Sequence, residues 1–532
     1  MKFKKGILTT LITPLLFTSW GNSGEYVIKD SNLNANIIQD NYDTYYQIFV
    51  GSFSDSNNDG IGDIKGIINR LDYLNDGDPN SGKSLGITGI WLTPIFNSTS
   101  YHKYDVIDYY EIDEDFGTLD DLKQFIAACH TRDIKLIIDL PINHTSTINS
   151  WYGKFVQALR NNDTENQYYD FYSSYKKEEI PSSITCKQIA GTDYYYECNF
   201  SDSMPELNFD SNEVRQEVVN IAKYYLDLGI DGFRFDAAKY IYFNSNQKSV
   251  EFWNWYMTEL KKIKEDIYCV GEIWDNDNVI TPYYQSMNCF EFTMAQGEGK
   301  IAATTKGRNT VNNFINYIIS RLNTVKKQNS NAILNPFIAN HDTDRAAGFL
   351  HVDKFQMQLA ANLYLLSSGN PFIYYGEEIG MKGSRGSANT DANRRLAMLW
   401  GDEDKVKNPP ESSFSKDNQI NGTVSSQLND KNSLYNYYKK LIMIRNANPE
   451  IARGNYTSLN LTISDEVGGF IASYNNKNVA VIHNLGLEEI KVSLRDYNQL
   501  SNMKINSYIG KGKAKIRQNT LTISPQTSVI LR

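Results

Sequence analysis

Four acidic residues stand where a carboxylate could do chemistry, at or near the end of a short apolar run. They are Asp139, Asp236, Glu272 and Asp342, and helical sequence lies between the runs. Acids at the C-terminal ends of successive strands are typical of the active face of a (β/α)8 barrel. Like charges at one mouth raise the pKa of at least one carboxyl, which can then act as an acid near neutral pH. Two carboxylates serving as nucleophile and general acid can cleave a glycosidic bond.

Arg234 lies two residues before Asp236, so both side chains point to the same side of a strand. Burying such a pair for packing alone is costly, which favours a functional role in holding Asp236 ionised. His144 and His341 lie beside the acids and could donate hydrogen bonds to sugar hydroxyls. A metal-dependent barrel enzyme is an alternative, but Arg234 is better placed to hold a carboxylate than to share a site with a cation.

Other enzyme and binding classes find little support in the sequence. It contains no Ser or Cys nucleophile elbow, no phosphate-binding glycine loop and no His cluster for a catalytic transition metal. The net charge is −9, from 53 basic and 62 acidic residues, and no long basic run occurs. This charge balance argues against nucleic acid as a partner.

The loop 55–63 carries oxygen-bearing groups at alternate positions. Asp55, Asn57, Asp59 and Asp63 would offer side-chain oxygens, and Ile61 its backbone carbonyl, to a hard cation such as calcium. Acidic and amide groups this close together would repel one another without a cation. The alternative is an Asx-rich turn without metal. The pattern predicts a structural Ca²⁺ site.

The order of apolar runs predicts an α/β fold with three parts. We expect a (β/α)8 TIM barrel with a small domain inserted after strand 3 and a C-terminal antiparallel β-sandwich domain. The barrel is assigned to residues 25–142 and 211–448, the inserted domain to 143–210 and the C-terminal domain to 449–532. The predicted barrel strands are 45–50, 87–92, 135–139, 230–235, 267–272, 289–292, 336–341 and 371–376.

Residues 1–24 have the pattern of a secretory signal peptide: a basic start, an apolar run and then small polar residues. The sequence therefore predicts a secreted, extracellular protein, and no other stretch is a candidate transmembrane segment. We expect a monomer. Cys186 and Cys198 flank a tyrosine-rich segment, where they could close a hairpin as a disulfide or remain thiols.

The strand-end segments resemble the signature regions of the α-amylase family of glycoside hydrolases, in the family's order. The resemblance runs from about residue 45 to 380. A weaker similarity extends to residues 394–400 and to the C-terminal domain. The segment 204–208 (MPELN) resembles a fifth signature, found in amylases intermediate between oligo-1,6-glucosidases and neopullulanases, with Glu206 where Asp is usual. The resemblance implies an enzyme that retains anomeric configuration.

Carried over by position, the resemblance implies a role for each residue at the site. Asp236 is expected to be the nucleophile, Glu272 the general acid/base and Asp342 the residue that stabilises the transition state through sugar hydroxyls. Arg234 is expected to keep Asp236 charged, and Tyr104 to stack on the sugar at the cleavage site.

The resemblance also implies the remaining ligands and the substrate. His144 and His341 are expected to hydrogen-bond the sugar, with Asp105 and Lys239 in the same substrate-binding set. The loop 55–63 resembles the family's calcium loop. Ala-Ala-Lys after the nucleophile resembles α-amylases more than oligo-1,6-glucosidases, which favours the α-1,4 bonds of an α-glucan, starch or maltooligosaccharides. Tyr240 follows, where many amylases have His.

The leading hypothesis is a secreted α-amylase, and alternatives stay open besides the metal-dependent barrel enzyme. Within the family, an exo-acting α-glucosidase or a transglycosylase is an alternative, because an Asp directly after Tyr104 also occurs in exo-acting relatives. From another class, the chain could be a catalytically silent glycan-binding protein. The intact set of Asp236, Glu272 and Asp342 argues against that reading, because a binding protein has no need to retain all three.

Overall fold

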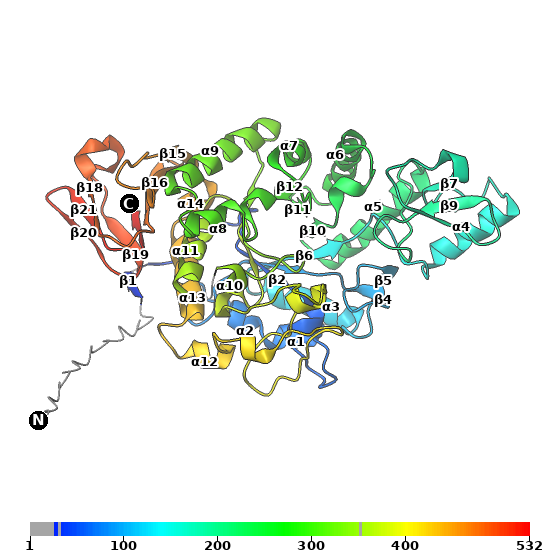
Figure 1. Ribbon diagram of the computed structural model, residues 1–532, viewed down its shortest axis with the longest axis horizontal. Helices are drawn as coiled ribbons and strands as arrows, with labels where there is room; N and C mark the ends of the chain where they lie inside the picture. The colour runs from blue at the N-terminus through cyan, green and yellow to red at the C-terminus, as the bar shows by residue number, and fades with distance from the viewer. Residues whose placement is uncertain (1–25, 30–32, 351–353) are drawn as a thin grey trace, which may run out of the picture.

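The computed structural model describes residues 26–29, 33–350 and 354–532. Figure 1 shows three parts side by side: the C-terminal β domain at the left, the barrel in the centre and the inserted segment projecting to the right. The predicted signal peptide, residues 1–24, lies outside the described residues. Among the residues described, no helix is long and apolar enough to cross a membrane.

Eight parallel strands form the central barrel. They pair in the order β13-β12-β11-β10-β6-β3-β2-β14, and a bridge between Phe337 and Phe372 links the two edges. The predicted (β/α)8 barrel is confirmed. The strands are β2 (Tyr45–Ile48), β3 (Gly89–Leu92), β6 (Lys135–Leu140), β10 (Gly232–Phe235), β11 (Tyr268–Gly271), β12 (Asn288–Phe290), β13 (Leu334–Asn335) and β14 (Phe372–Tyr374).

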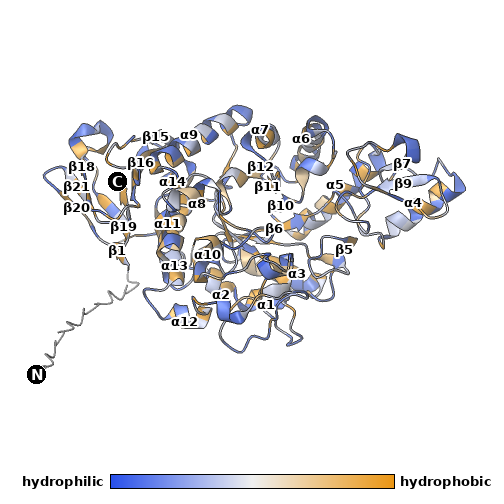
Figure 2. Ribbon diagram, in the orientation of Figure 1, coloured by the Kyte–Doolittle hydropathy of each residue, from blue (hydrophilic) through white to orange (hydrophobic). Residues whose placement is uncertain are grey.

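Amphipathic helices surround the barrel, and local sequence signals set their ends. α3 (Leu119–His130) begins at a capping box formed by Thr118 and Asp121. α5 (Asn212–Leu228) ends at Gly229, whose φ of 108° lies in the left-handed region that favours glycine. In Figure 2 the helices change between hydrophobic and hydrophilic colours along their length, as expected when one face packs on the strands.

The other helices are α1 (Ile64–Asn69), α2 (Leu71–Leu74), α6 (Asn246–Ile263), α7 (Asp277–Ile280), α8 (Lys300–Thr305), α9 (Val311–Gln328), α10 (Ala346–Phe349), α11 (Lys354–Leu365), α12 (Val424–Leu428), α13 (Leu434–Ala447) and α14 (Glu450–Arg453). They lie mainly between or after the barrel strands, as a (β/α)8 topology requires.

The seventh barrel strand differs from its prediction. The sequence predicted a strand over 336–341, whereas β13 covers Leu334–Asn335 and pairs with β12. Pro336 has no N–H to donate, so it interrupts the ladder at that point. The following residues leave the strand early and carry His341 and Asp342 into the barrel mouth as a loop.

The inserted segment after β6 builds a small domain of its own. It contains α4 (Ser150–Asn161) and a three-stranded antiparallel sheet with the order β7-β9-β8. These strands are β7 (Ser174–Lys176), β8 (Cys186–Gln188) and β9 (Tyr194–Glu197). Of the two alternatives for Cys186 and Cys198, a disulfide or free thiols, the structure has free thiols. An earlier hairpin, β4 (Phe96–Ser98) with β5 (Val106–Ile112), supports the loop that carries Tyr104.

The C-terminal domain has two antiparallel sheets over a separate hydrophobic core. The first has the order β1-β19-β22-β17-β16-β15, and the second β18-β21-β20. Its core includes Leu461, Ile471, Ile482 and Val529. The strands are β1 (Val27–Lys29), β15 (Asn455–Ser458), β16 (Val467–Tyr474), β17 (Lys477–Asn484), β18 (Ile490–Ser493), β19 (Ile505–Gly510), β20 (Ala514–Arg517), β21 (Thr520–Ile523) and β22 (Thr527–Leu531).

One domain boundary needs a correction. The barrel was predicted to begin at residue 25, but β1 pairs antiparallel with β19 and is an edge strand of the C-terminal sheet. The first barrel strand begins only at Tyr45. Three residues with weak sequence patterning could not reveal this pairing, because their partner lies almost at the other end of the chain.

Candidate active site

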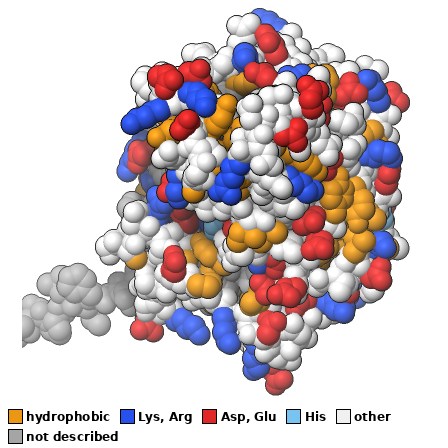
Figure 3. Space-filling model, turned by 90° about the vertical axis from the view of Figure 1, so that its right-hand side faces the viewer, with side chains coloured by type: hydrophobic (Ala, Val, Ile, Leu, Met, Phe, Trp, Pro, Cys, Tyr) orange, Lys and Arg blue, Asp and Glu red, His pale blue; other side chains and the backbone are white. Residues whose placement is uncertain are grey.

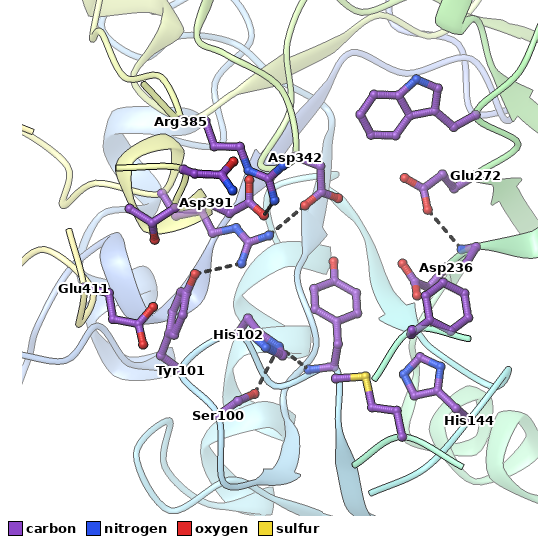
Figure 4. A pocket seen from close by; sticks show the side chains of 18 of the residues that line it. Ser100, Tyr101, His102, His144, Asp236, Glu272, Asp342, Arg385, Asp391 and Glu411 are labelled. Atoms are coloured by element: carbon purple, nitrogen blue, oxygen red, sulfur yellow. Dashed lines mark hydrogen bonds and ion pairs between the residues drawn. The ribbon is translucent and has the colours of Figure 1, made fainter. Parts of the chain in front are cut away.

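The carboxyl ends of the barrel strands open into a cavity of about 970 Å³. Asp236 follows β10, Glu272 follows β11 and Asp342 lies beyond β13, and all three line this cavity. In Figure 4, Asp236, Glu272 and His144 lie on one side, Tyr101, Asp391 and Glu411 lie on the other, and Asp342 lies between them. Figure 3 shows a hollow in the face at the inserted-domain end, with a His side chain at its base.

Arg234 is the buried cation that organises the acids. Its side chain is 0% exposed, and Nη1 lies 2.7 Å from Asp236 Oδ1 while Nη2 lies 3.0 Å from Glu272 Oε2. Nη1 also lies 2.9 Å from both oxygens of Asp139, which faces Arg234 across the parallel β10–β6 pair. One guanidinium therefore contacts three carboxylates, which lowers the free-energy cost of placing them together in a buried site.

Glu272 is held toward its neutral form. Burial, together with the charges of Asp236 and Asp342, raises the pKa of its carboxyl to about 8, although Arg234 opposes the shift. Its Oε2 accepts a hydrogen bond of 3.0 Å from the backbone N–H of Ala237. Ala237 adopts a left-handed backbone with φ of 42°, an uncommon conformation for a residue with a Cβ. A carboxyl protonated at neutral pH beside an ionised one is the pairing that acid catalysis with a nucleophile requires.

Asp342 is held as a carboxylate. Burial alone would raise its pKa, but His341, Arg395 and Arg234 together bring the pKa well below the usual range. Arg395 Nη2 lies 2.7 Å from Asp342 Oδ1, and Nη1 donates to the Tyr101 hydroxyl at 3.0 Å. Asp342 is therefore a fixed negative charge that faces the cavity.

Tyr104 and His341 form a stacked pair beneath the cavity. Their ring centroids are 5.6 Å apart with planes 2° from parallel, and the Tyr104 hydroxyl lies 2.6 Å from His341 Nε2. The hydroxyl also donates to Asp139 Oδ2 at 2.9 Å, and Gln47 lies 2.7 Å from the other His341 nitrogen. Burial lowers the pKa of His341 to about 3, although the Asp342 carboxylate opposes the shift. Tyr104 lines the cavity, whereas His341 is buried behind it and steadies it.

His144 is free to bind a ligand. It is 2% exposed and lines the cavity, and neither ring nitrogen has a hydrogen-bond partner. Burial lowers its pKa, so the ring is neutral and offers one donor and one acceptor. An unpaired buried polar group is costly unless a ligand satisfies it, which fits a contact to a sugar hydroxyl.

Like His341, Asp105 and Lys239 were predicted to bind substrate and do not line the cavity. The Asp105 carboxylate accepts hydrogen bonds from the hydroxyls of Ser98, Thr99 and Ser100, and it does not line the cavity. Lys239 does not line it either, because Nζ lies 2.9 Å from Asp275 and donates to the Trp274 carbonyl at 3.0 Å. In this structure both side chains position neighbouring segments.

In the loop 55–63, acidic side chains accept hydrogen bonds from backbone N–H groups. Asp55 accepts from the N–H groups of Asn57, Asn58 and Gly60, and Asp63 caps α1 through the Gly66 N–H. Within the described ranges, no group of three or more His, Cys, Asp or Glu is arranged to hold a metal ion. The Ca²⁺ site formed by Asp55, Asn57, Asp59, Ile61 and Asp63 stays a prediction.

Comparison with known proteins identifies the family. The alpha-amylase catalytic-domain model matches residues 47–454, and the model of the alpha-amylase SusG C-terminal domain matches residues 467–530. The chain belongs to the α-amylase family of glycoside hydrolases. The predicted resemblance is confirmed, and the α-amylase-family catalytic model covers the barrel from residue 47 onward together with its inserted domain.

Relatives of this α-amylase-family chain include hydrolases and transferases. Alpha-amylase 3 of Dictyoglomus thermophilum is 34% identical over 492 residues, which is 92% of each chain. The solved structure of Eubacterium rectale Amy13B superposes with a TM-score of 0.87 at 35% identity, covering 94% of this chain and 97% of that one. A 4-alpha-glucanotransferase of Thermotoga maritima is 30% identical over 356 residues, covering 65% of this chain and 74% of the relative.

The α-amylase-family site also contains residues to which the sequence assigned no role. Asp139 was recognised as a strand-end acid, but its contact with Arg234 follows from the β10–β6 register alone. Arg395 lies in a segment that matched the family only weakly, and it pairs with Asp342 across 53 positions. Phe200 and Trp274 line the cavity from the inserted domain and from the loop after β11. No periodic pattern could have shown that these two rings face the same space.

Proposed function

We propose that this protein hydrolyses the α-1,4-glucosidic bonds of starch and maltooligosaccharides with retention of configuration. The observation that carries the proposal is that one buried guanidinium, Arg234, contacts both Asp236 and Glu272. Contact with one guanidinium brings the two carboxyl groups near each other, which supports the retaining arrangement, in which they are about 5–5.5 Å apart. The wider spacing of an inverting enzyme would leave room for a water between them.

In the first step, an Asp236 oxygen attacks the anomeric carbon of the sugar at the cleavage site. Glu272 donates its proton to the glycosidic oxygen, and the bond between that oxygen and the anomeric carbon breaks. Arg234 donates a hydrogen bond of 2.7 Å to Asp236, and burial raises the pKa of Glu272, which favours its protonated form. Asp342 and His144 are placed to bind the hydroxyls of the same sugar as it flattens toward the transition state.

In the second step, the Glu272 carboxylate takes a proton from a water molecule, and the water oxygen attacks the anomeric carbon. The ester bond to Asp236 breaks, and its electron pair returns to the aspartate. Two displacements at the same carbon retain the anomeric configuration. Glu272 ends the cycle protonated and ready for the next bond.

The choice of α-1,4 bonds rests on the sequence after the nucleophile and on the relatives. Ala237 and Ala238 resemble the α-amylase pattern, and one relative that matches over 92% of this chain carries the name alpha-amylase. An exo-acting α-glucosidase is the second candidate, supported by relatives named oligo-1,6-glucosidase at 28% identity. Charged residues at the cavity end opposite Glu272, among them Asp391 and Glu411, could shorten that end for an exo-acting enzyme.

The product profile from soluble starch tests the proposal, with Glu272→Gln as the inactive control. A rapid fall in iodine staining with mixed maltooligosaccharides supports endo-acting α-1,4 hydrolysis. Release of glucose or one short product with slow loss of staining supports the exo-acting candidate. Absence of hydrolysis by the wild type would overturn the proposal and favour a silent glycan-binding protein.

We further propose that the protein is exported and acts as a monomer. Export is supported by the signal pattern of residues 1–24, which lie outside the described residues. An extracellular enzyme would meet starch, a polymer too large to enter a cell. Cell fractionation with an antibody, combined with light scattering on the purified protein, tests both statements.

A further inference from the structure

The charges of this protein are divided unevenly between its domains. Residues 454–532 carry nine basic and five acidic residues, a net charge of +4, whereas residues 1–453 carry 44 basic and 57 acidic residues, a net charge of −13. Among the described residues, Arg532 is the only basic side chain of 454–532 in an ion pair, and its partner is Glu450. The C-terminal domain therefore carries unpaired positive charge on an acidic protein. Such asymmetry is typical of proteins that bind a polyanion or an anionic surface.

Four of the unpaired basic side chains lie together on the sheet β18-β21-β20. Alternate residues of its strands enter the hydrophobic core of the domain, so the residues between them point outward. The register places Lys515 opposite Thr522, and Thr522 opposite Lys491. Arg517 follows Lys515 by two residues, and Lys513 directly precedes β20. All four basic side chains are exposed, and they are hereafter the basic face.

The basic face concentrates like charges. Adjacent strands lie about 5 Å apart and alternate residues about 7 Å, so each charge has a neighbour within about 10 Å, the Debye length at 0.1 M salt. Glu489, directly before β18, offsets part of this charge. Lysine on an edge strand also prevents pairing with another sheet, but that role needs no net charge of +4 on the domain. An anionic surface would offset the remaining repulsion.

The basic face and the catalytic cavity lie at opposite ends of the protein. In Figure 1, β18, β21 and β20 lie at the left edge of the fold, and the inserted domain projects to the right. Figure 3 views the right-hand end and shows the hollow with a His side chain at its base. A surface in contact with the basic face would therefore leave the cavity open to a polymeric substrate.

We propose that the basic face docks this protein on a membrane surface that contains anionic phospholipids. The outward side chains of one small sheet can approach a plane of headgroups together. The predicted signal peptide precedes β1, which pairs with β19 in the same domain, so a segment expected to act at a membrane joins the fold in this domain. Each Lys or Arg near an anionic bilayer should strengthen binding by roughly fivefold. Docking of this kind does not depend on the reaction in the cavity.

The test compares binding of the full chain to vesicles of phosphatidylcholine alone and to vesicles that also contain about 40% phosphatidylglycerol. The measured quantity is the ratio of the two partition coefficients, in which apolar contributions cancel. We expect a ratio well above one at low salt and a steep fall as NaCl rises, because salt screens the charges. Lys515→Gln/Arg517→Gln should lower the ratio by roughly 25-fold, about fivefold for each lost charge, and leave starch hydrolysis unchanged.

Lys83→Gln/Lys431→Gln is the matched control, because both lysines are exposed outside the C-terminal domain and the change in net charge is the same. Its ratio should stay near that of the wild type. A wild-type ratio of one would overturn the proposal. Equal losses in the two double variants would also overturn it, because total charge and not the basic face would then govern binding.

Two further outcomes would assign the basic face to another role and overturn membrane docking. The first is binding of soluble polyphosphate through the basic face without any binding to anionic vesicles. The second is aggregation of Lys515→Gln/Arg517→Gln with an unchanged vesicle ratio, which would identify protection of the edge strand as the role of these side chains. Starch hydrolysis measured on the same samples shows whether the proposed hydrolytic function stands independently.

Discussion

Glu272 accepts a hydrogen bond from the backbone N–H of Ala237, the residue directly after Asp236, at 3.0 Å. The position of the acid is thus tied to the chain segment that carries the nucleophile. Ala237 also has a left-handed backbone, with φ of 42°. A chain deformation that moved one carboxyl group would therefore tend to move the other with it.

Glu272→Gln should lower kcat on starch by about 10²- to 10⁴-fold, the range for loss of a general acid. Fluoride release from α-maltosyl fluoride in single turnover should fall far less, because fluoride leaves without a proton. Asp236→Asn should abolish both reactions, because it removes the attacking oxygen's charge. Equal losses on starch and fluoride in Glu272→Gln would contradict the assignment of Glu272 as the acid.

The pH profile of kcat/KM on starch should be limited on its alkaline side by Glu272. The pKa of this carboxyl is about 8, and only the protonated form donates. The rate should hold below that pH and fall about tenfold per unit above it. In Glu272→Gln, fluoride release should lose this alkaline limb. A wild-type rate still flat at pH 10 would show that another group supplies the proton.

Arg395→Lys should reduce kcat/KM by about 10²-fold with most of the loss in kcat. Arg395 contacts both Asp342 and Tyr101, and lysine cannot reproduce two directed N–H bonds from a planar group. Arg385→Lys is the control, since this side chain lines the same cavity but is 47% exposed and pairs with Asp391. Similar losses of kcat/KM in both variants would mean that the two directed hydrogen bonds of Arg395 have no special role in catalysis.

We propose that Ca²⁺ binds the loop 55–63 and stabilises the fold. Adding 1–5 mM CaCl₂ after chelation should raise Tm through mass action, by an amount that grows with concentration. Asp59→Ala should abolish that shift, whereas Asp72→Ala, on the exposed surface of α2, should preserve it. An unchanged Tm in the wild type would identify the loop as an Asx-rich turn that needs no metal.

The sequence was informative about the barrel because strand, acid and helix recur in a fixed order. The runs ending at Asp139, Asp236 and Glu272 became strands β6, β10 and β11 nearly as predicted. α5 ended at Gly229 because its left-handed conformation excludes most other residues. Such features depend on neighbouring residues, so periodicity and capping rules apply directly.

The sequence was less informative about the direction of side chains in loops and about contacts between residues far apart in the chain. Asp105 followed Tyr104 directly, yet its carboxylate turns into its own loop and binds three hydroxyl groups. Side-chain direction in a loop depends on its local hydrogen bonds, which no spacing rule supplies. Arg395 reached the site only because the chain after β14 folds back over the barrel mouth.

The covalent intermediate tests the central claim most directly. We would react the protein with 5-fluoro-α-maltosyl fluoride, which slows release from the ester, and map the labelled peptide by mass spectrometry. The account predicts one maltosyl-derived group on the peptide that contains Asp236, and none in Asp236→Asn. Label on Asp342 or Asp139, or turnover with inverted configuration and no label, would contradict it.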